Sequence, residues 1–196
     1  MQLGRLEADK QWKVFTVKGE EIPCQVVDKN PLGAKLIFVA QDIPSLGYKT
    51  FHLVQQAGSA RQTNLTASKL NLKNEYLDVT IDEKTGLIKQ IYDRINKREV
   101  LADPRGNVLQ LRKIENKGDD AWNLGYVGKW MDLDKATKIE LVETGPVRVT
   151  IHVKRDYLGP QKPQRSPTEN FPSSFFDQYI SLYLGLPYLE VRNHIE

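Results

Sequence analysis

Short apolar runs of strand length recur along the whole chain, and they constrain its fold more than any other feature of the sequence. In Val147 to Val153, apolar residues occupy every second position and polar residues lie between them, which is the period of a strand with one buried face. No segment with the period of a helix is longer than about ten residues and also has capping residues at both ends. The sequence therefore predicts an all-β chain.

Nine more runs have strand length. They are Trp12 to Val17, Leu36 to Ala40, Lys49 to Val54, Tyr76 to Ile81, Leu87 to Tyr92, Val108 to Leu111, Ile139 to Val142, Phe175 to Leu184 and Leu189 to Val191. Turn sequences separate many of them, such as Asp82 to Gly86 and Thr144 to Pro146. Many short strands at nearly regular intervals are typical of a sandwich or barrel.

Two stretches interrupt this rhythm. Gly58 to Thr66 is small and polar, which predicts a linker between two sandwiches. Leu158 to Ser174 contains four prolines and cannot donate a full ladder of hydrogen bonds, so it predicts a long loop. We therefore expect two domains, at residues 1–62 and 63–196.

Composition excludes several classes of partner. The 28 basic and 25 acidic residues give a net charge of only +3, and they are spread along the chain, so no nucleic-acid surface is expected. No stretch approaches the about 18 consecutive apolar residues of a membrane span. The single cysteine, Cys24, forms no internal disulfide and has no metal-ligand spacing around it, which favours a reducing, cytoplasmic compartment.

Several segments resemble the β domains of α-mannosidases of glycoside hydrolase family 38. Ile43 to Tyr48 is similar to the small β domain of these enzymes. The similarity to their large β domain lies in Leu72 to Ile81, Leu87 to Arg94, Arg98 to Leu101, Gly106 to Leu111, Asp120 to Trp122, Gly145 to Arg148, Gln178 to Tyr183 and Leu189 to Arg192. The resemblance implies a small β-sandwich over residues 1–62. Residues 63–196 would form the first part of a larger, mutarotase-like antiparallel β-supersandwich that is truncated at its C-terminus.

The same resemblance implies a parent enzyme that hydrolyses terminal α-D-mannosides with retention and depends on zinc. Retention needs two carboxyl groups about 5–5.5 Å apart. In the family these groups and the zinc ligands belong to an N-terminal α/β barrel, which this chain does not contain. We therefore expect no catalytic residue, metal or other cofactor in this chain. Its expected partners are that barrel, of the same polypeptide, and the carbohydrate substrate.

Asp119, Asp120 and Trp122 are the candidate carbohydrate-contacting residues of the chain. Adjacent carboxylates beside an indole offer hydrogen-bond acceptors and a stacking face to a sugar. We expect this loop to face the barrel and to help wall its cleft. The alternative is that the two aspartates begin a turn and the tryptophan closes one end of a sandwich. The family pattern has an acidic residue where Asn123 stands, which weakens any role assigned to the loop.

Other chemically capable residues receive structural interpretations. His52, His152 and His194 are expected to be solvent-facing or hydrogen-bonded strand residues, without zinc-ligand spacing. Asp132 to Asp134 lacks the glycine and the distal glutamate of a calcium loop and predicts an exposed turn. Trp12 and Trp130 are expected to pack in a core or between domains.

Two further functions stay open. A free-standing carbohydrate-binding module would show coplanar exposed aromatic residues. An aldose-epimerase-like enzyme would need a histidine, such as His152 or His194, and a carboxylate in one pocket. We also expect an exposed strand edge, at Gln178 to Leu184 or at Leu189 to Ile195, and therefore a dimer or domain swap.

Overall fold

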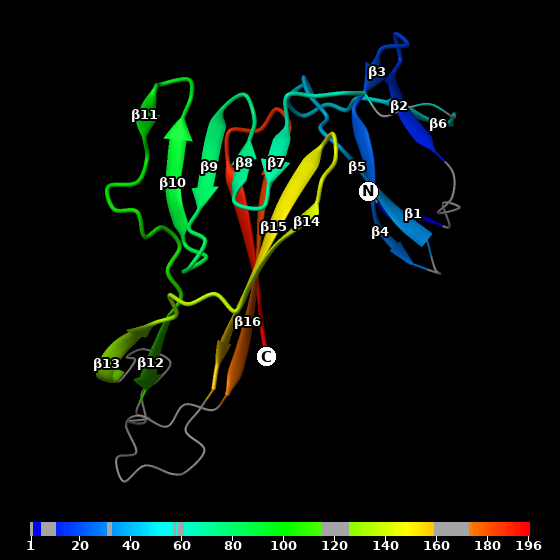
Figure 1. The fold of residues 1–196 in the computed structure, drawn as a ribbon. Coiled ribbons are helices and arrows are strands. Elements are labelled where there is room, and N and C mark those ends of the chain that lie inside the picture. The colour runs from blue at the N-terminus through cyan, green and yellow to red at the C-terminus, as the bar shows by residue number, and fades with distance from the viewer. Residues whose placement is uncertain are drawn as a thin grey trace.

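The computed structural model shows an all-β protein (Figure 1), and the prediction of the fold class is confirmed. The structure describes residues 2–4, 11–30, 33–56, 58, 61–114, 126–158 and 173–196. Its strands are β1 (Gln2–Gly4), β2 (Trp12–Thr16), β3 (Glu21–Ile22), β4 (Cys24–Asn30), β5 (Gly33–Phe38), β6 (Phe51–Gln55), β7 (Thr66–Ser68), β8 (Asn71–Lys73), β9 (Leu77–Ile81), β10 (Ile88–Asp93), β11 (Arg98–Glu99), β12 (Gln110–Ile114), β13 (Tyr126–Asp132), β14 (Lys138–Glu143), β15 (Arg148–Tyr157), β16 (Ser174–Tyr183) and β17 (Leu189–Ile195). Every apolar run predicted above overlaps one of these strands.

The first six strands form what we call the N-terminal unit. It consists of two antiparallel three-stranded sheets, ordered β1-β5-β4 and β3-β2-β6. Val14 of β2 and Leu36 of β5 are buried at its centre, and Trp12, Phe38 and Phe51 pack against them. Trp12 therefore has the packing role expected from the sequence. The proposed domain boundary after residue 62 stays a prediction.

The larger part of the chain is a sandwich of two antiparallel sheets. One sheet has the order β11-β10-β9-β8-β7 and the other the order β14-β15-β16-β17. Their facing side chains share one core, in which Leu72 and Val79 of the first sheet meet Ile151, Ile180 and Leu182 of the second. The alternation seen in the sequence explains this core, because every second residue of β15 points toward the opposite sheet.

The order of the second sheet decides between the two strand edges predicted from the sequence. β16 pairs with both β15 and β17, so its segment Gln178 to Leu184 is internal. β17 is an edge strand among the described residues. An exposed edge can pair with another strand, and the dimer or domain swap expected from it stays a prediction.

The turn between β9 and β10 lies directly on this sandwich. The Asp82 carboxylate accepts hydrogen bonds from the Lys84 and Thr85 amides at 3.0 and 2.8 Å, and the Gly86 amide donates to the Asp82 carbonyl at 2.9 Å. Gly86 has a φ of +68°. A Cβ at this position would lie 2.5 Å from Cγ1 of Val153. The predicted turn is confirmed, and its glycine is needed both for its backbone angle and for its close contact with β15.

Arg155 is a buried cation beneath this turn, with 1% of its surface exposed. Its guanidinium donates to the Gln178 side-chain carbonyl and, at 3.1 Å, to the Thr85 carbonyl. Burial lowers the pKa of this guanidinium to about 10, which still leaves it charged at neutral pH. The core is therefore not purely apolar, and hydrogen bonds to neutral groups hold this charge.

Asn74 joins the two sheets of the sandwich. This side chain is fully buried, and its amide donates to the carbonyls of Tyr183 and Leu186 at 2.7 and 2.9 Å. Its side-chain oxygen accepts the amides of Tyr76 and Leu77, both at 2.8 Å. Every polar atom of the side chain is thus hydrogen-bonded, and the pairing fixes the start of β9 against the β16–β17 turn.

Two local predictions were wrong. Leu65, in the stretch expected to be a linker poor in core residues, is buried in the sandwich core, and Thr66 already begins β7. Asp132 to Asp134 is not an exposed turn, because Asp132 ends β13 and Leu133 is buried. The Asp132 carboxylate accepts hydrogen bonds from Arg105 and Gln110, both at 2.7 Å. The position of Asp132 at the end of β13 and its hydrogen bonds to Arg105 and Gln110 therefore explain this residue structurally.

Candidate functional site

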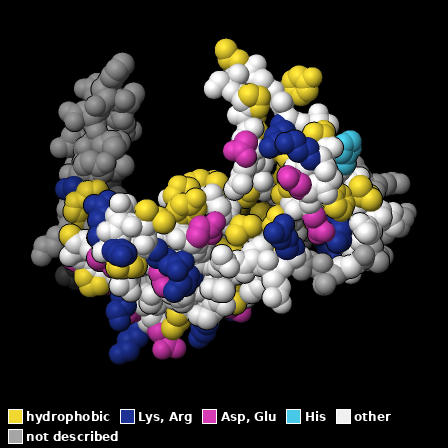
Figure 2. All heavy atoms as spheres, turned by 90° about the horizontal axis from the view of Figure 1, so that it is seen from above, with side chains coloured by type: hydrophobic (Ala, Val, Ile, Leu, Met, Phe, Trp, Pro, Cys, Tyr) yellow, Lys and Arg dark blue, Asp and Glu magenta, His cyan; other side chains and the backbone are white. Residues whose placement is uncertain are grey.

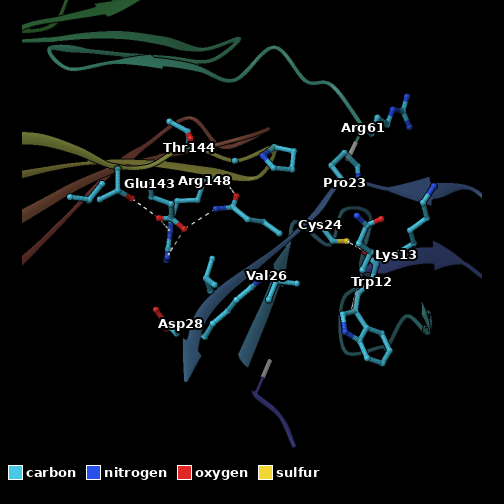
Figure 3. A pocket seen from close by; sticks show the side chains of 18 of the residues that line it. Trp12, Lys13, Pro23, Cys24, Val26, Asp28, Arg61, Glu143, Thr144 and Arg148 are labelled. Carbon is cyan, nitrogen blue, oxygen red and sulfur yellow. Dashed lines mark hydrogen bonds and ion pairs between the residues drawn. The ribbon is translucent and has the colours of Figure 1, made fainter. Parts of the chain in front are cut away.

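A cleft of about 770 Å³ lies between the N-terminal unit and the second sheet of the sandwich. Figure 3 shows Trp12, Lys13 and Cys24 on the side of the N-terminal unit, and Glu143, Thr144 and Arg148 on the side of the sandwich. The end of the turn between β14 and β15 meets β4 in this cleft, where Gln25 accepts hydrogen bonds from Val147 and Arg148. Polar side chains make up much of its walls.

Glu143 is the centre of a polar network in this cleft. Its carboxylate accepts two hydrogen bonds from the Arg148 guanidinium, at 2.7 and 3.0 Å, and one from the Thr150 hydroxyl at 2.8 Å. A bidentate pair of this kind has a fixed geometry and is among the stronger ion pairs. Thr150 is itself buried and lies 2.9 Å from the Ser181 hydroxyl on β16.

Gln25 connects this network to the N-terminal unit. Its side-chain amide donates to Glu143 at 2.8 Å, and its side-chain oxygen accepts the backbone amides of Val147 and Arg148 at 3.1 and 2.8 Å. A Cβ at Gly145 would lie only 2.2 Å from Cδ of Gln25. The turn therefore requires a residue without a side chain at this position, which lets Gln25 approach the backbone.

The electrostatics of Arg148 agree with a structural role. Burial by itself lowers the pKa of the guanidinium, but the hydrogen bonds and charges of Glu143 and Tyr183 outweigh burial and raise this pKa above its ordinary value. The Glu143 carboxylate already accepts hydrogen bonds from Gln25, Arg148 and Thr150. The arrangement suits a permanent ion pair, whereas a general acid or base needs a proton site facing its substrate.

The opposite wall of the cleft carries the only cysteine of the chain. The Cys24 thiol donates to the Trp12 carbonyl at 3.2 Å. Burial raises the pKa of this thiol, so it is protonated at neutral pH and is a poor nucleophile. Because its thiol is protonated and hydrogen-bonded, Cys24 acts as a packing residue. Beside it, Lys13 and Glu21 form an ion pair at 3.0 Å.

The histidines lie on strands, as the sequence predicts. His152 is half-buried on β15, lies 2.5 Å from the Asp177 carboxylate and stacks on the Tyr179 ring. His194 lies opposite Asp177 in the β16–β17 register, but its side chain contacts Glu196 at 3.1 Å. Neither histidine is among the residues that line the cleft. The structure thus brings His152 to a carboxylate without placing the pair in this cleft.

The candidate residues Asp119, Asp120 and Trp122 lie outside the described residues, so their role stays a prediction. Trp130 is half-exposed on β13, and the Arg112 guanidinium lies 4.7 Å from the centre of its ring. This cation–π contact accounts for Trp130 without a sugar. Trp130 therefore does not pack in a core, and packing between domains stays a prediction.

Sequence reasoning missed Gln25, Glu143 and Thr150. The Gly145 to Arg148 segment was noted for its resemblance to a family, but nothing in the sequence indicated that Gln25 would meet it. Among the described residues, no three His, Cys, Asp or Glu side chains converge to hold a metal ion. These residues therefore do not fit the zinc expected for the parent enzyme. The described part of the chain also contains no helix that would reach across a membrane.

Comparisons with known proteins show what this chain is similar to. Residues 72–196 match the sequence model described as the glycosyl hydrolases family 38 C-terminal domain. A comparison with curated protein sequences gives no significant match. Two solved structures from Enterococcus faecalis are similar. A protein in glycosyl hydrolase family 38 has a TM-score of 0.65 and 12% identity, and the match covers 95% of this chain and 26% of that one. An alpha-mannosidase of strain V583 has a TM-score of 0.61 and 14% identity, with 96% and 25% covered.

Proposed function

Because this chain belongs to glycosyl hydrolase family 38, with residues 72–196 matching the C-terminal domain of that family, we propose that it is a non-catalytic β portion of an α-mannosidase. In this proposal the parent enzyme hydrolyses terminal α-D-mannosides, and the present chain supports the catalytic barrel and walls part of its cleft. The chain spans about a quarter of the length of the solved structures that it matches. The carboxylates and the zinc of the reaction would then belong to the remaining part of the polypeptide.

The structural observation that carries this proposal is that the Glu143 carboxylate is already hydrogen-bonded within the chain. Retaining hydrolysis needs one carboxylate free to attack the sugar and a second carboxyl group to transfer a proton. Glu143 lies in the cleft, but Gln25, Arg148 and Thr150 already donate to its oxygens. Glu143, the carboxylate in the cleft that could have taken part in the reaction, instead connects the N-terminal unit to the sandwich through Gln25.

A direct test compares this 196-residue chain with the full-length polypeptide that carries it. Each is given a chromogenic α-mannoside with added zinc, and release of the dye is followed by absorbance. We expect turnover by the full-length polypeptide only. Circular dichroism of the shorter chain serves as the control, because a β-rich spectrum with a cooperative thermal transition shows that inactivity does not come from unfolding.

Zinc-dependent turnover by the 196-residue chain alone would overturn the proposal, since it would place the reacting groups within these residues. Turnover of another glycoside, but not of a mannoside, by the full-length polypeptide would leave the supporting role intact. That outcome would contradict the proposed substrate.

A further inference from the structure

The loop that joins β5 to β6 presents apolar side chains to solvent. We call residues 42–49 the apolar loop. Leu46 is fully exposed, with a relative exposure of 110%, and Tyr48 and Ile43 are exposed to 87% and 54%. Single exposed apolar residues are common on protein surfaces, but several gathered on one loop indicate an interaction site.

The apolar loop has a defined conformation. The Gly47 amide donates to the Pro44 carbonyl at 3.1 Å and closes a turn. The Lys49 ammonium donates to the Gln41 carbonyl at 3.0 Å and ties the two ends of the loop together. These two hydrogen bonds constrain the backbone of the loop, which reduces the backbone entropy lost on binding.

The base of the apolar loop lies at the junction between the N-terminal unit and the sandwich. Val39 and Ala40, which precede the loop, line a pocket together with Val147 and Tyr183 of the second sheet. The next residue, Gln41, approaches Gly185 in the β16–β17 turn, where its side-chain nitrogen lies 3.1 Å from the position of an added Cβ. The loop is thus anchored on both parts of the fold, and its tip extends from this anchor.

The backbone of the apolar loop is strained at its most exposed residue. Leu46 has a φ of +55° and Asp42 a φ of +53°, in the left-handed region that residues with a side chain rarely adopt. Such strain persists where other interactions compensate for it, and it concentrates at binding sites. The Pro44–Gly47 turn holds Leu46 in this conformation, and no described part of the chain covers its side chain.

We propose that the apolar loop docks into an apolar pocket on the remaining part of the parent polypeptide, with Leu46 and Tyr48 as the inserted side chains. This inference rests on the proposed function. The solved structures that this chain matches contain about three quarters of their length outside the match, so a large neighbouring surface is available in the same molecule. Figure 2 shows charges of both signs spread over the visible surface, which favours an apolar contact over an electrostatic one.

Cysteine labelling tests this docking without reference to activity. Leu46→Cys is made in the 196-residue chain and in the full-length polypeptide, and the rate of maleimide labelling at this position is measured by peptide mass spectrometry. We expect labelling to be at least about tenfold slower in the full-length polypeptide, because the docked contact must open before the thiol reacts. Val17→Cys is the matched control, since Val17 is 65% exposed in a turn of the same unit. It should label at the same rate in both.

Equal labelling of Leu46→Cys in both forms would overturn the docking proposal, while the hydrolysis test of the proposed function would stand unchanged. Slow labelling in the 196-residue chain that becomes fast on dilution would also overturn it, because a second copy would then cover the loop. Hydroxyl-radical footprinting of Tyr48 in the unsubstituted proteins provides a second measurement in case the cysteine disturbs the contact. Protection of Tyr48 only in the full-length polypeptide is the expected result.

Discussion

Replacing Glu143 by alanine is expected to lower the free energy of unfolding by about 2–4 kcal/mol. The change removes the carboxylate that pairs with the Arg148 guanidinium, whose side chain is 12% exposed. It also removes the acceptor for Gln25 and Thr150. A charge left without its partner in a largely buried position is strongly destabilising, although the partial exposure of both side chains keeps the effect below that of a fully buried pair. Urea unfolding followed by tryptophan fluorescence measures it.

Glu140→Ala is the matched control for this prediction. Glu140 lies on the same strand, β14, and pairs with Lys138 at 2.8 Å, but both side chains are about half-exposed. Exposed pairs contribute about 0–1 kcal/mol, so this variant should unfold almost as the original chain does. Equal midpoints for the two variants would show that the Glu143 network does not hold the N-terminal unit against the sandwich.

Gly86→Ala is expected to lower the free energy of unfolding by about 2–5 kcal/mol. The left-handed backbone at this position costs about 1–2 kcal/mol for any residue with a Cβ. The added methyl group would also lie 2.5 Å from Val153 and 2.9 Å from Ala136, and overpacking of this kind costs about 1–3 kcal/mol more. Thermal unfolding by differential scanning calorimetry gives the shift in midpoint.

Gly19→Ala separates the two contributions. Gly19 has a φ of +82°, but a Cβ there would meet no atom within 4 Å. This variant should therefore show the backbone contribution alone, about 1–2 kcal/mol. If Gly86→Ala is no more destabilised than Gly19→Ala, the turn between β9 and β10 can move away from β15 without loss, and the close packing described above is not required.

The sequence predicted the sandwich well because alternation is a local property. In β15, one face carries Val149, Ile151 and Val153, and this pattern is readable without knowledge of any other strand. Strands without alternation were missed. β4 contains two adjacent valines followed by charged residues, and its strand conformation depends on pairing with β5 rather than on its own pattern.

The cleft could not be predicted for a related reason. Gln25 and Glu143 are 118 residues apart, and neither belongs to a motif with a recognised chemistry. Their contact depends on how the N-terminal unit sits against the β14–β15 turn, which only the folded chain determines. Leu65 was assigned to a linker because its neighbours are polar and small. A single apolar residue at the end of such a stretch gives no periodic signal, yet it fills the sandwich core.

The long sequence separation of the Gln25 contacts has a consequence for the order of folding. β14 and β15, and likewise β16 and β17, are joined by short turns, so these hairpins form from nearby residues. Gln25 is 122 and 123 positions from the amides that it binds, and closing so long a loop before the hairpins exist is entropically unfavourable. Gln25→Ala should therefore accelerate unfolding and leave the refolding rate nearly unchanged. Stopped-flow measurements would show this as a shift of the unfolding arm of the chevron alone.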